Sequence, residues 1–184
     1  SVSDGEYSIE SSFDLVVSPI NDAPILSDID NQNIDEDSSL SVELSAEDID
    51  GDQLYYDASV DGNASVQLSG TSLNVTPDEN YNGTIVVSYS VSDGEYSISS
   101  SFDLVVNPVN DAPVLSDIDD QVIDEDGVLS VELSASDIDG DSLTFSATNG
   151  DSDISVDGTT LTITPPANYN GSNDVTVTVT DGDL

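Results

Sequence analysis

The sequence contains no lysine, arginine, histidine or cysteine among its 184 residues, whereas 39 residues are acidic. No side chain can therefore neutralise these carboxylates, which must face water, share protons or bind cations from solution. The formal net charge of −39 repels nucleic acids and anionic membrane surfaces, and we exclude both as direct partners. Without cysteine, the chain cannot use disulfide bonds in any compartment.

These absences also narrow the classes of function. The lack of histidine, cysteine and lysine removes most nucleophiles and general bases, so that only paired carboxylates, as in glycoside hydrolysis, could support catalysis. We predict that the chain is not an enzyme. Tryptophan is absent and only 3 phenylalanines and 7 tyrosines are present for stacking on sugar rings. A calcium-dependent carbohydrate-binding module stays open as an alternative. No apolar run reaches the ~18 residues that would span a membrane.

Internal repetition determines the organisation of the chain. Residues 1–24 recur as residues 90–113 with three differences, Glu10 for Ser99, Ser18 for Asn107 and Ile20 for Val109. Residues 25–54 recur at 114–143, and Tyr81 recurs as Tyr169. We predict three segments: the last strand of a preceding repeat or a donor strand at 1–20, a complete repeat at 21–109, and a repeat without its last strand at 110–184.

Apolar and polar residues alternate along short segments of each repeat. The pattern is strict in LSVELSA (40–46 and 129–135), and it returns in IVVSYSV (85–91), FDLVV (102–106) and VTVTVT (175–180). A period of two with Asp-Gly, Asn-Gly and Pro between segments predicts β-strands joined by turns. Seven such strands in about 89 residues, with no helical period, predict tandem all-β, Greek-key, immunoglobulin-like sandwiches arranged end to end.

The phasing of the repeats leaves two interpretations open. The sequence stops at DGDL without a counterpart of SSSFDLVV, while residues 7–17 supply such a strand at the other end. The chain is either a window cut from a longer array, which is the simpler interpretation, or a subunit whose N-terminal strand completes the next copy's sandwich.

Acidic residues concentrate at predicted turns and strand ends. In each repeat they occupy NDAP (21–24, 110–113), IDED (34–37, 123–126, with Glu125), DIDGD (48–52, 137–141) and a DG turn (93–94, 181–182), and the first repeat adds PDEN (77–80). Of the 39 acids, 30 are aspartate, the short side chain typical of turns and oxygen-ligand loops. Each motif alone could be an ordinary turn, but their repetition in register without any cation favours metal binding.

The order of these motifs resembles cadherins and bacterial cadherin-like repeats over the whole chain. NDAP looks like the cadherin linker, DIDGD like the Asp-X-Asp loop, the DG turn like the aspartate motif near the sixth strand, and DED like the base glutamate. The resemblance implies Ca²⁺ at the junction between successive sandwiches. Tyr81 and Tyr169 match a structural corner tyrosine.

The resemblance also implies the ligands. At one junction these would be Asn21, Asp22, Asp48, Asp50 and Asp93, and at the other Glu36, Asp37, Asp78, Glu79, Asn110, Asp111, Asp137, Asp139 and Asp181. Asp52 and Asp141 are explained equally well by a turn and by a metal. Pro19 and Pro108 stand where the family's linker has its first aspartate, so we expect one or two ions per junction. DIDGD alone carries enough acids to bind one ion within its own loop.

The spacing between the acidic motifs supports this placement independently of the family resemblance. Twelve extended residues from Pro24 to Glu36 span ~40 Å, about the length of one sandwich, so NDAP and DED belong at opposite ends. We predict an extracellular, bacterial cell-surface repeat that calcium stiffens within a large adhesin or filament. Its partners would be neighbouring repeats or head-to-tail copies, with a glycan or a cell surface as a further possibility.

Overall fold

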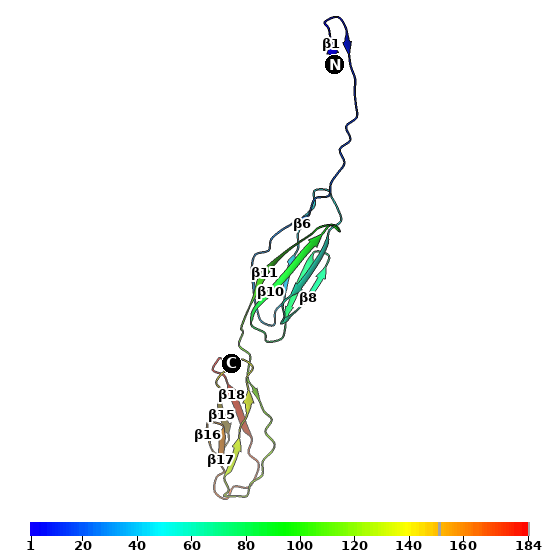
Figure 1. Cartoon of the computed structure of the whole chain (residues 1–184). Helices are drawn as coiled ribbons and strands as arrows, with labels where there is room; N and C mark the ends of the chain where they lie inside the picture. Colours follow the sequence, from blue (N-terminus) through cyan, green and yellow to red (C-terminus); the bar gives the residue numbers. More distant parts are fainter. Residues whose placement is uncertain (151, 184) are drawn as a thin grey trace. The chain divides into compact units, whose positions relative to one another are not determined.

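The computed structural model describes residues 1–150 and 152–183 of the chain. These residues form two compact units, one of residues 1–78 and 83–106 and the other of residues 79–82 and 107–184. Strands and turns account for all of the described regular structure (Figure 1). The described part of the chain contains no helix long and apolar enough to cross a membrane.

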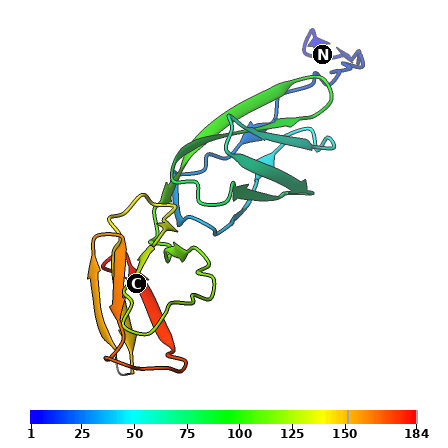
Figure 2. The same ribbon diagram turned by 90° about the horizontal axis from the view of Figure 1, so that it is seen from below.

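The first unit is a two-sheet sandwich. One sheet has the order β4-β11-β10-β7, formed by Gln32–Asp35, Ser97–Asn107, Gly83–Ser92 and Tyr55–Val60. The other side contains β5-β9-β8, formed by Leu40–Glu43, Ser72–Pro77 and Ala64–Ser69, and the short pair β3-β6, Ile25–Leu26 with Ala46–Glu47. The long β10–β11 hairpin is prominent in Figure 2.

The first strand of this unit divides between the two sheets. Its β3 part pairs antiparallel with β6, whereas its β4 part lies beside β11. Asp28 accepts a hydrogen bond from the Ser100 hydroxyl, and Asn31 accepts one from the Asp103 backbone N–H, so this segment runs parallel to β11. The chain thereby carries NDAP and DED to opposite ends of the unit, as the spacing predicts.

The prediction of one continuous strand at 40–46 is wrong, because the structure divides this segment into β5 and β6 with a break at Leu44–Ser45. Leu44 is buried and its N–H donates to the Thr71 carbonyl at 2.8 Å, while the Ser45 carbonyl accepts from Ser27 at 2.9 Å. The strand therefore changes partner, from β9 to β3, and regular pairing breaks at the change. The segment predicted at 129–135 is interrupted in the same way.

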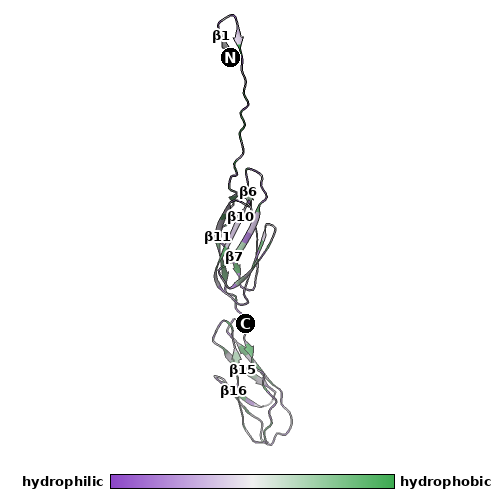
Figure 3. Cartoon of the chain, turned by 45° about the vertical axis from the view of Figure 1, so that its right-hand side comes forward, coloured by the Kyte–Doolittle hydropathy of each residue, from purple (hydrophilic) through white to green (hydrophobic). Residues whose placement is uncertain are grey.

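The core of the first unit lies between its sheets. Ten described apolar side chains are buried there: Leu44, Leu73, Val75, Ile85, Val87, Tyr89, Val91, Phe102, Leu104 and Val106. Hydropathy alternates along the strands because inward and outward residues alternate on a pleated sheet (Figure 3). The Tyr89 hydroxyl accepts from Ile29 N–H and donates to the Ser27 carbonyl, which anchors the segment between β3 and β4.

The second unit repeats the plan with β12 to β18. Val114–Leu115 (β12) pairs with Ala135–Ser136 (β14), and Thr144–Asn149 (β15) pairs with Val175–Thr180 (β18). The third sheet has the order β13-β17-β16, formed by Leu129–Glu132, Thr160–Thr164 and Asp153–Asp157. Its buried core, among described residues, consists of Leu133, Leu161 and Ile163.

Residues 1–20 contain one small hairpin, Val2–Ser3 (β1) with Ser8–Ile9 (β2). Residues 10–20 have no regular secondary structure, and their apolar side chains are exposed.

Candidate metal centres

The Asp-X-Asp-Gly-Asp loop of the first unit follows β6. Its carboxylates Asp48, Asp50 and Asp52 place one oxygen each within 4.8 Å of one another. Asp48 Oδ1 accepts the N–H groups of Asp50, at 2.9 Å, and Asp52, at 3.2 Å, which folds the loop around that side chain. Gly51 has φ 79°, a left-handed conformation that glycine adopts without strain.

The linker motif lies against this loop. The Asp22 N–H donates to Asp50 Oδ2 at 2.8 Å, and the Asn21 side-chain amide donates to Asp93 Oδ2 at 2.9 Å. Residues far apart in sequence therefore meet at one end of the unit. The structure brings together all five residues predicted for this centre.

Asp93 also organises the turn between β10 and β11. Its Oδ1 accepts the N–H groups of Tyr96, at 2.6 Å, and Glu95, at 2.7 Å. These bonds, with the Tyr96 N–H as the largest contribution and the Asn21 amide as a smaller one, lower the pKa of the Asp93 carboxyl from its usual 3.8. The carboxylate is thus held ionised, with one oxygen in the turn and the other facing the linker.

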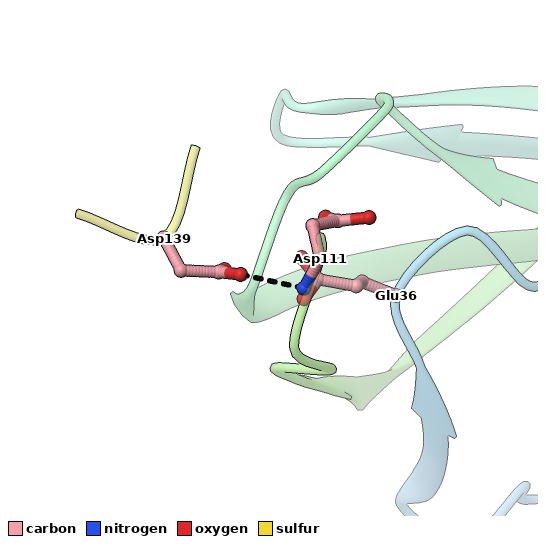
Figure 4. A group of neighbouring side chains, drawn as sticks. All are labelled: Glu36, Asp111 and Asp139. Atoms are coloured by element: carbon pink, nitrogen blue, oxygen red, sulfur yellow. Dashed lines mark hydrogen bonds between the residues drawn. The ribbon is translucent and has the colours of Figure 1, made fainter. Parts of the chain in front are cut away.

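The second unit contains an equivalent centre. Asp111 N–H donates to Asp139 Oδ2 at 2.7 Å (Figure 4), and the Asn110 amide donates to Asp181 Oδ2 at 2.9 Å. Asp137, Asp139 and Asp141 form the corresponding carboxylate group. The same sequence motif thus produces the same geometry twice.

One observation in these loops supports a cation. Asp48 Oδ2 and Asp137 Oδ2, at equivalent positions, are buried oxygen atoms that accept no hydrogen bond. A buried carboxylate oxygen without a donor is costly, and a missing ion is a standard explanation. Two ligands on opposite sides of a calcium ion, each at 2.3–2.6 Å, lie about 5 Å apart, which fits the carboxylate spacing. The all-oxygen donor set of Asp and Asn also suits calcium.

The carboxylates of the second centre lie close enough to affect the ionisation of Asp141. The pKa of Asp141 is raised from 3.8, first by partial desolvation and then by the charges of Asp137, Asp139, Asp181 and Asp183. Asp183 was not among the predicted ligands. Its only sequence signal is its position two residues after Asp181, and the folded turn brings it within electrostatic range of Asp141.

The other predicted ligands come from turns that follow β4 and β9. Glu36 and Asp37 form the turn after β4; Glu36 is buried, 4% exposed, whereas its counterpart Glu125 is exposed. Asp78 follows β9, and Glu79 is exposed in the short segment that belongs to the second unit. That these four residues share an ion with the Asn110 linker stays a prediction.

Tyr169, which the sequence predicts to be a structural corner tyrosine, bonds to the main chain. Tyr169 donates its hydroxyl proton to the Ser172 carbonyl at 2.7 Å, which closes the turn before β18. This contact supports a structural corner over a ligand contact.

Comparison with known proteins agrees with the fold. The sequence profile described as bacterial Ig domain matches residues 21–103 and 110–184. Human protocadherin-24 EC1-2 (form II) has a TM-score of 0.52 and 17% identity, over 87% of this chain and 94% of that chain. Drosophila N-cadherin EC1-4 has a TM-score of 0.51 and 14% identity, over 86% and 48%. No curated protein matches the chain.

At these identities the structural likeness concerns the fold alone, and it confirms the predicted cadherin-like, immunoglobulin-like architecture. The profile match covers both repeats and therefore most of the chain. The chain belongs to the bacterial Ig domain family, of which it contains two tandem copies.

Proposed function

We propose that the chain is a calcium-binding structural repeat of a large extracellular protein, and that calcium stiffens the connection between its domains. Domains of this fold are generally structural and not catalytic. The observation that carries the proposal is the pair of buried, unbonded oxygens at Asp48 and Asp137, one in each repeat.

The carboxylates of each Asp-X-Asp-Gly-Asp loop repel one another when no cation is bound. Three carboxylates within 4.8 Å repel one another by up to ~4 kcal/mol per pair at an effective dielectric near 20, and no side chain of the sequence can offset this. A divalent cation would reverse the sign of these interactions. It would also tie the linker residue Asp22 to the loop, because Asp22 already donates its N–H to Asp50.

Calcium would then act on the linker more than on the sandwiches. Asn21 and Asn110 open the two linkers, and both side chains contact the DG turn of the following repeat. A metal at this end would fix the conformation of the linker as it enters that repeat. In an array, such fixation would convert a flexible chain of domains into a stiffer one. We place this array at the cell surface, in an adhesin or filament, since extracellular calcium is abundant enough to fill such sites.

The test is calcium titration of two matched double variants. Asp48→Asn/Asp137→Asn removes the inward carboxylate from both loops, whereas Asp30→Asn/Asp119→Asn removes the same charge at exposed, equivalent positions away from them. We expect the first pair to weaken calcium binding by roughly tenfold or more and the second to leave it nearly unchanged. Isothermal titration calorimetry measures both.

A melting curve provides the second measurement. Calcium at 100 times its Kd stabilises a site by ~2.7 kcal/mol, so EDTA should lower the melting temperature. An unchanged melting temperature would contradict the proposal. Equal weakening of calcium binding in both double variants would mean that calcium only screens the overall charge.

A further inference from the structure

We propose that the side-chain amides of Asn21 and Asn110 hold the linkers against the following repeats by a hydrogen bond that needs no cation. Each amide would turn over when calcium binds and face the ion with its oxygen. The proposal concerns the regulation of the calcium centres and therefore rests on the function proposed above. In both conditions the two asparagines act as positioning residues for the linker.

In the first unit, two hydrogen bonds connect the linker to the repeat, and in both of them the linker is the donor. The Asn21 amide donates to Asp93 Oδ2 at 2.9 Å, and the Asp22 N–H donates to Asp50 Oδ2 at 2.8 Å. Both acceptors are carboxylate oxygens, so these bonds are charge-assisted and roughly twice as strong as bonds between neutral groups. The bonds are made between groups of the chain itself and so require no cation.

The second unit has the same pair of bonds. The Asn110 amide donates to Asp181 Oδ2 at 2.9 Å, and the Asp111 N–H donates to Asp139 Oδ2 at 2.7 Å. The Asn110 amide also donates a longer bond, of 3.4 Å, to the Asp111 carbonyl oxygen. Because the geometry recurs in two separate units, it follows from the motif and not from one local packing arrangement.

The carboxylate that accepts from each asparagine is oriented by its own turn. Asp93 Oδ1 accepts the N–H groups of Glu95, at 2.7 Å, and Tyr96, at 2.6 Å. Asp181 Oδ1 accepts the Asp183 N–H at 2.8 Å. Since one oxygen of each carboxylate is held in the turn, the other faces the linker. The linker side chain must therefore adapt to the carboxylate.

Asparagine can adapt because its side chain has a donor end and an acceptor end. The NH₂ group donates to a carboxylate, whereas the amide oxygen would repel it. Calcium requires the opposite orientation, since its ligands are oxygen atoms. Rotation about the Cβ–Cγ bond exchanges the two ends, and this torsion has a broad, roughly two-fold preference. The exchange therefore needs little movement of the backbone.

Aspartate at the same positions would suit only one of the two conditions. Without an ion, a carboxylate at position 21 would repel Asp93, and the sequence has no lysine, arginine or histidine to offset this. With calcium bound, the added carboxylate would be the stronger ligand, because ligand charge raises calcium affinity. In a chain with 39 acidic residues, asparagine at positions 21 and 110 thus lowers calcium affinity and keeps the linker docked without the ion.

The backbone bond of the next residue reports whether the linker is docked. A carboxylate has two oxygens, so Asp50 can keep the Asp22 N–H on one of them and offer the other to an ion. The same holds for Asp139 and the Asp111 N–H in the second unit. These two N–H groups should therefore be bonded with and without calcium as long as the asparagines position the linker.

The experiment compares the native chain with three double variants in EDTA and in calcium. Asn21→Ala/Asn110→Ala removes both ends of the amide, and Asn21→Asp/Asn110→Asp leaves only oxygen atoms. Ser41→Asp/Ser130→Asp is the control, which adds the same charge at exposed, equivalent positions of β5 and β13. Because Asn21 and Asn110 lie outside the strands, the variants should fold, and circular dichroism checks that they do.

The first measurement is hydrogen exchange of the Asp22 and Asp111 N–H groups in EDTA, by nuclear magnetic resonance and corrected for intrinsic rates. Both groups are bonded in the native chain and should exchange at least about tenfold more slowly than in the alanine or aspartate variant. The serine control should match the native chain. In the native chain, the Asn21 amide protons should also show nuclear Overhauser effects to the turn at 93–96 in EDTA and lose them in calcium.

The second measurement is calcium affinity by isothermal titration calorimetry. The aspartate variant should bind calcium roughly tenfold more tightly or better, because it gains a charged ligand and has no amide hydrogen bond to break. The alanine variant lacks the oxygen and should bind about threefold more weakly or worse. A role confined to holding the linker would shift both variants in the same direction.

The outcomes separate this proposal from the proposed function. Equal exchange of the Asp22 and Asp111 N–H groups in the native chain and the alanine variant in EDTA would overturn this proposal and leave calcium binding standing. Calcium affinities that shift in the same direction in the alanine and aspartate variants would also overturn it. Slow exchange in EDTA without calcium binding to the native chain would contradict the proposed function, and the turning of the amide with it.

Discussion

Asp48 and Asp137 occupy the same position in the two repeats, and each turns one oxygen inward where no donor meets it. The other oxygen of each side chain holds the loop together, since it accepts a backbone N–H from Asp52 or Asp141. In each of these carboxylates, one oxygen is hydrogen-bonded within the loop and the other has no hydrogen-bond donor. This division explains why the loop is built from aspartate, whose two oxygens a serine or asparagine would not reproduce with the same charge.

At the residue scale, Asp141→Asn should stabilise the second unit when calcium is removed. The pKa of Asp141 is raised because desolvation and neighbouring carboxylates disfavour its ionised form. That ionised form therefore destabilises the folded state at neutral pH, and the cost is relieved as pH falls through the raised pKa towards 3.8.

Thermal melting in EDTA checks this expectation. The variant should melt above the native chain at pH 7, with the difference shrinking as pH approaches 4. Asp119→Asn, which removes an exposed charge from the same unit, controls for net charge. An equal rise in both variants would assign the effect to overall charge and not to the cluster.

At the element scale, one sequence occurs in two structural states. SFDLVV is a core strand in β11 and an exposed segment at 12–17. Local propensity is the same in both places, so only the available neighbours differ. The β-propensity of a segment therefore reflects the surface it packs against.

This contrast yields a matched pair of substitutions. Leu104→Ala removes a side chain that is fully buried and should cost roughly 2–5 kcal/mol of unfolding free energy. Leu15→Ala, in the identical local sequence but exposed, should change stability by less than about 0.5 kcal/mol. Denaturant unfolding at low protein concentration measures both; similar losses would mean that residues 12–17 are packed in solution.

At the scale of the whole molecule, two repeats with nearly the same motifs have unequal cores. The ten buried apolar side chains of the first unit compare with three in the second, among described residues. The equivalents of the missing side chains belong to β11 and its contacts. The difference has two sources: the described second unit has no counterpart of β11, and Asn173 stands where the first unit has the buried Ile85.

We therefore expect calorimetry to resolve two unfolding transitions, with the second unit melting first. Burial of apolar surface is the main source of stability, so the smaller core should unfold at lower temperature. Near-ultraviolet circular dichroism can assign the transitions. The first unit contains the buried Tyr89, whereas the equivalent position in β18 of the second unit is Val177. A single cooperative transition would show that the units unfold together.

The sequence by itself determined the repeat and the all-β class, and it located the acidic motifs that meet at the linker end of each repeat. Repetition in register is visible without coordinates, and a period of two fixes which side chains face inward. Tertiary structure decided what periodicity cannot show. The strand predicted at 40–46 breaks because its partner changes, an event that depends on residues 27 and 71. Asp183 joins the second centre only through its turn, and Asp48 acquires a buried, unbonded oxygen only when the loop closes. Strand pairing and burial depend on neighbours that are distant in the sequence. The identical segments 12–17 and 101–106 therefore have different surroundings.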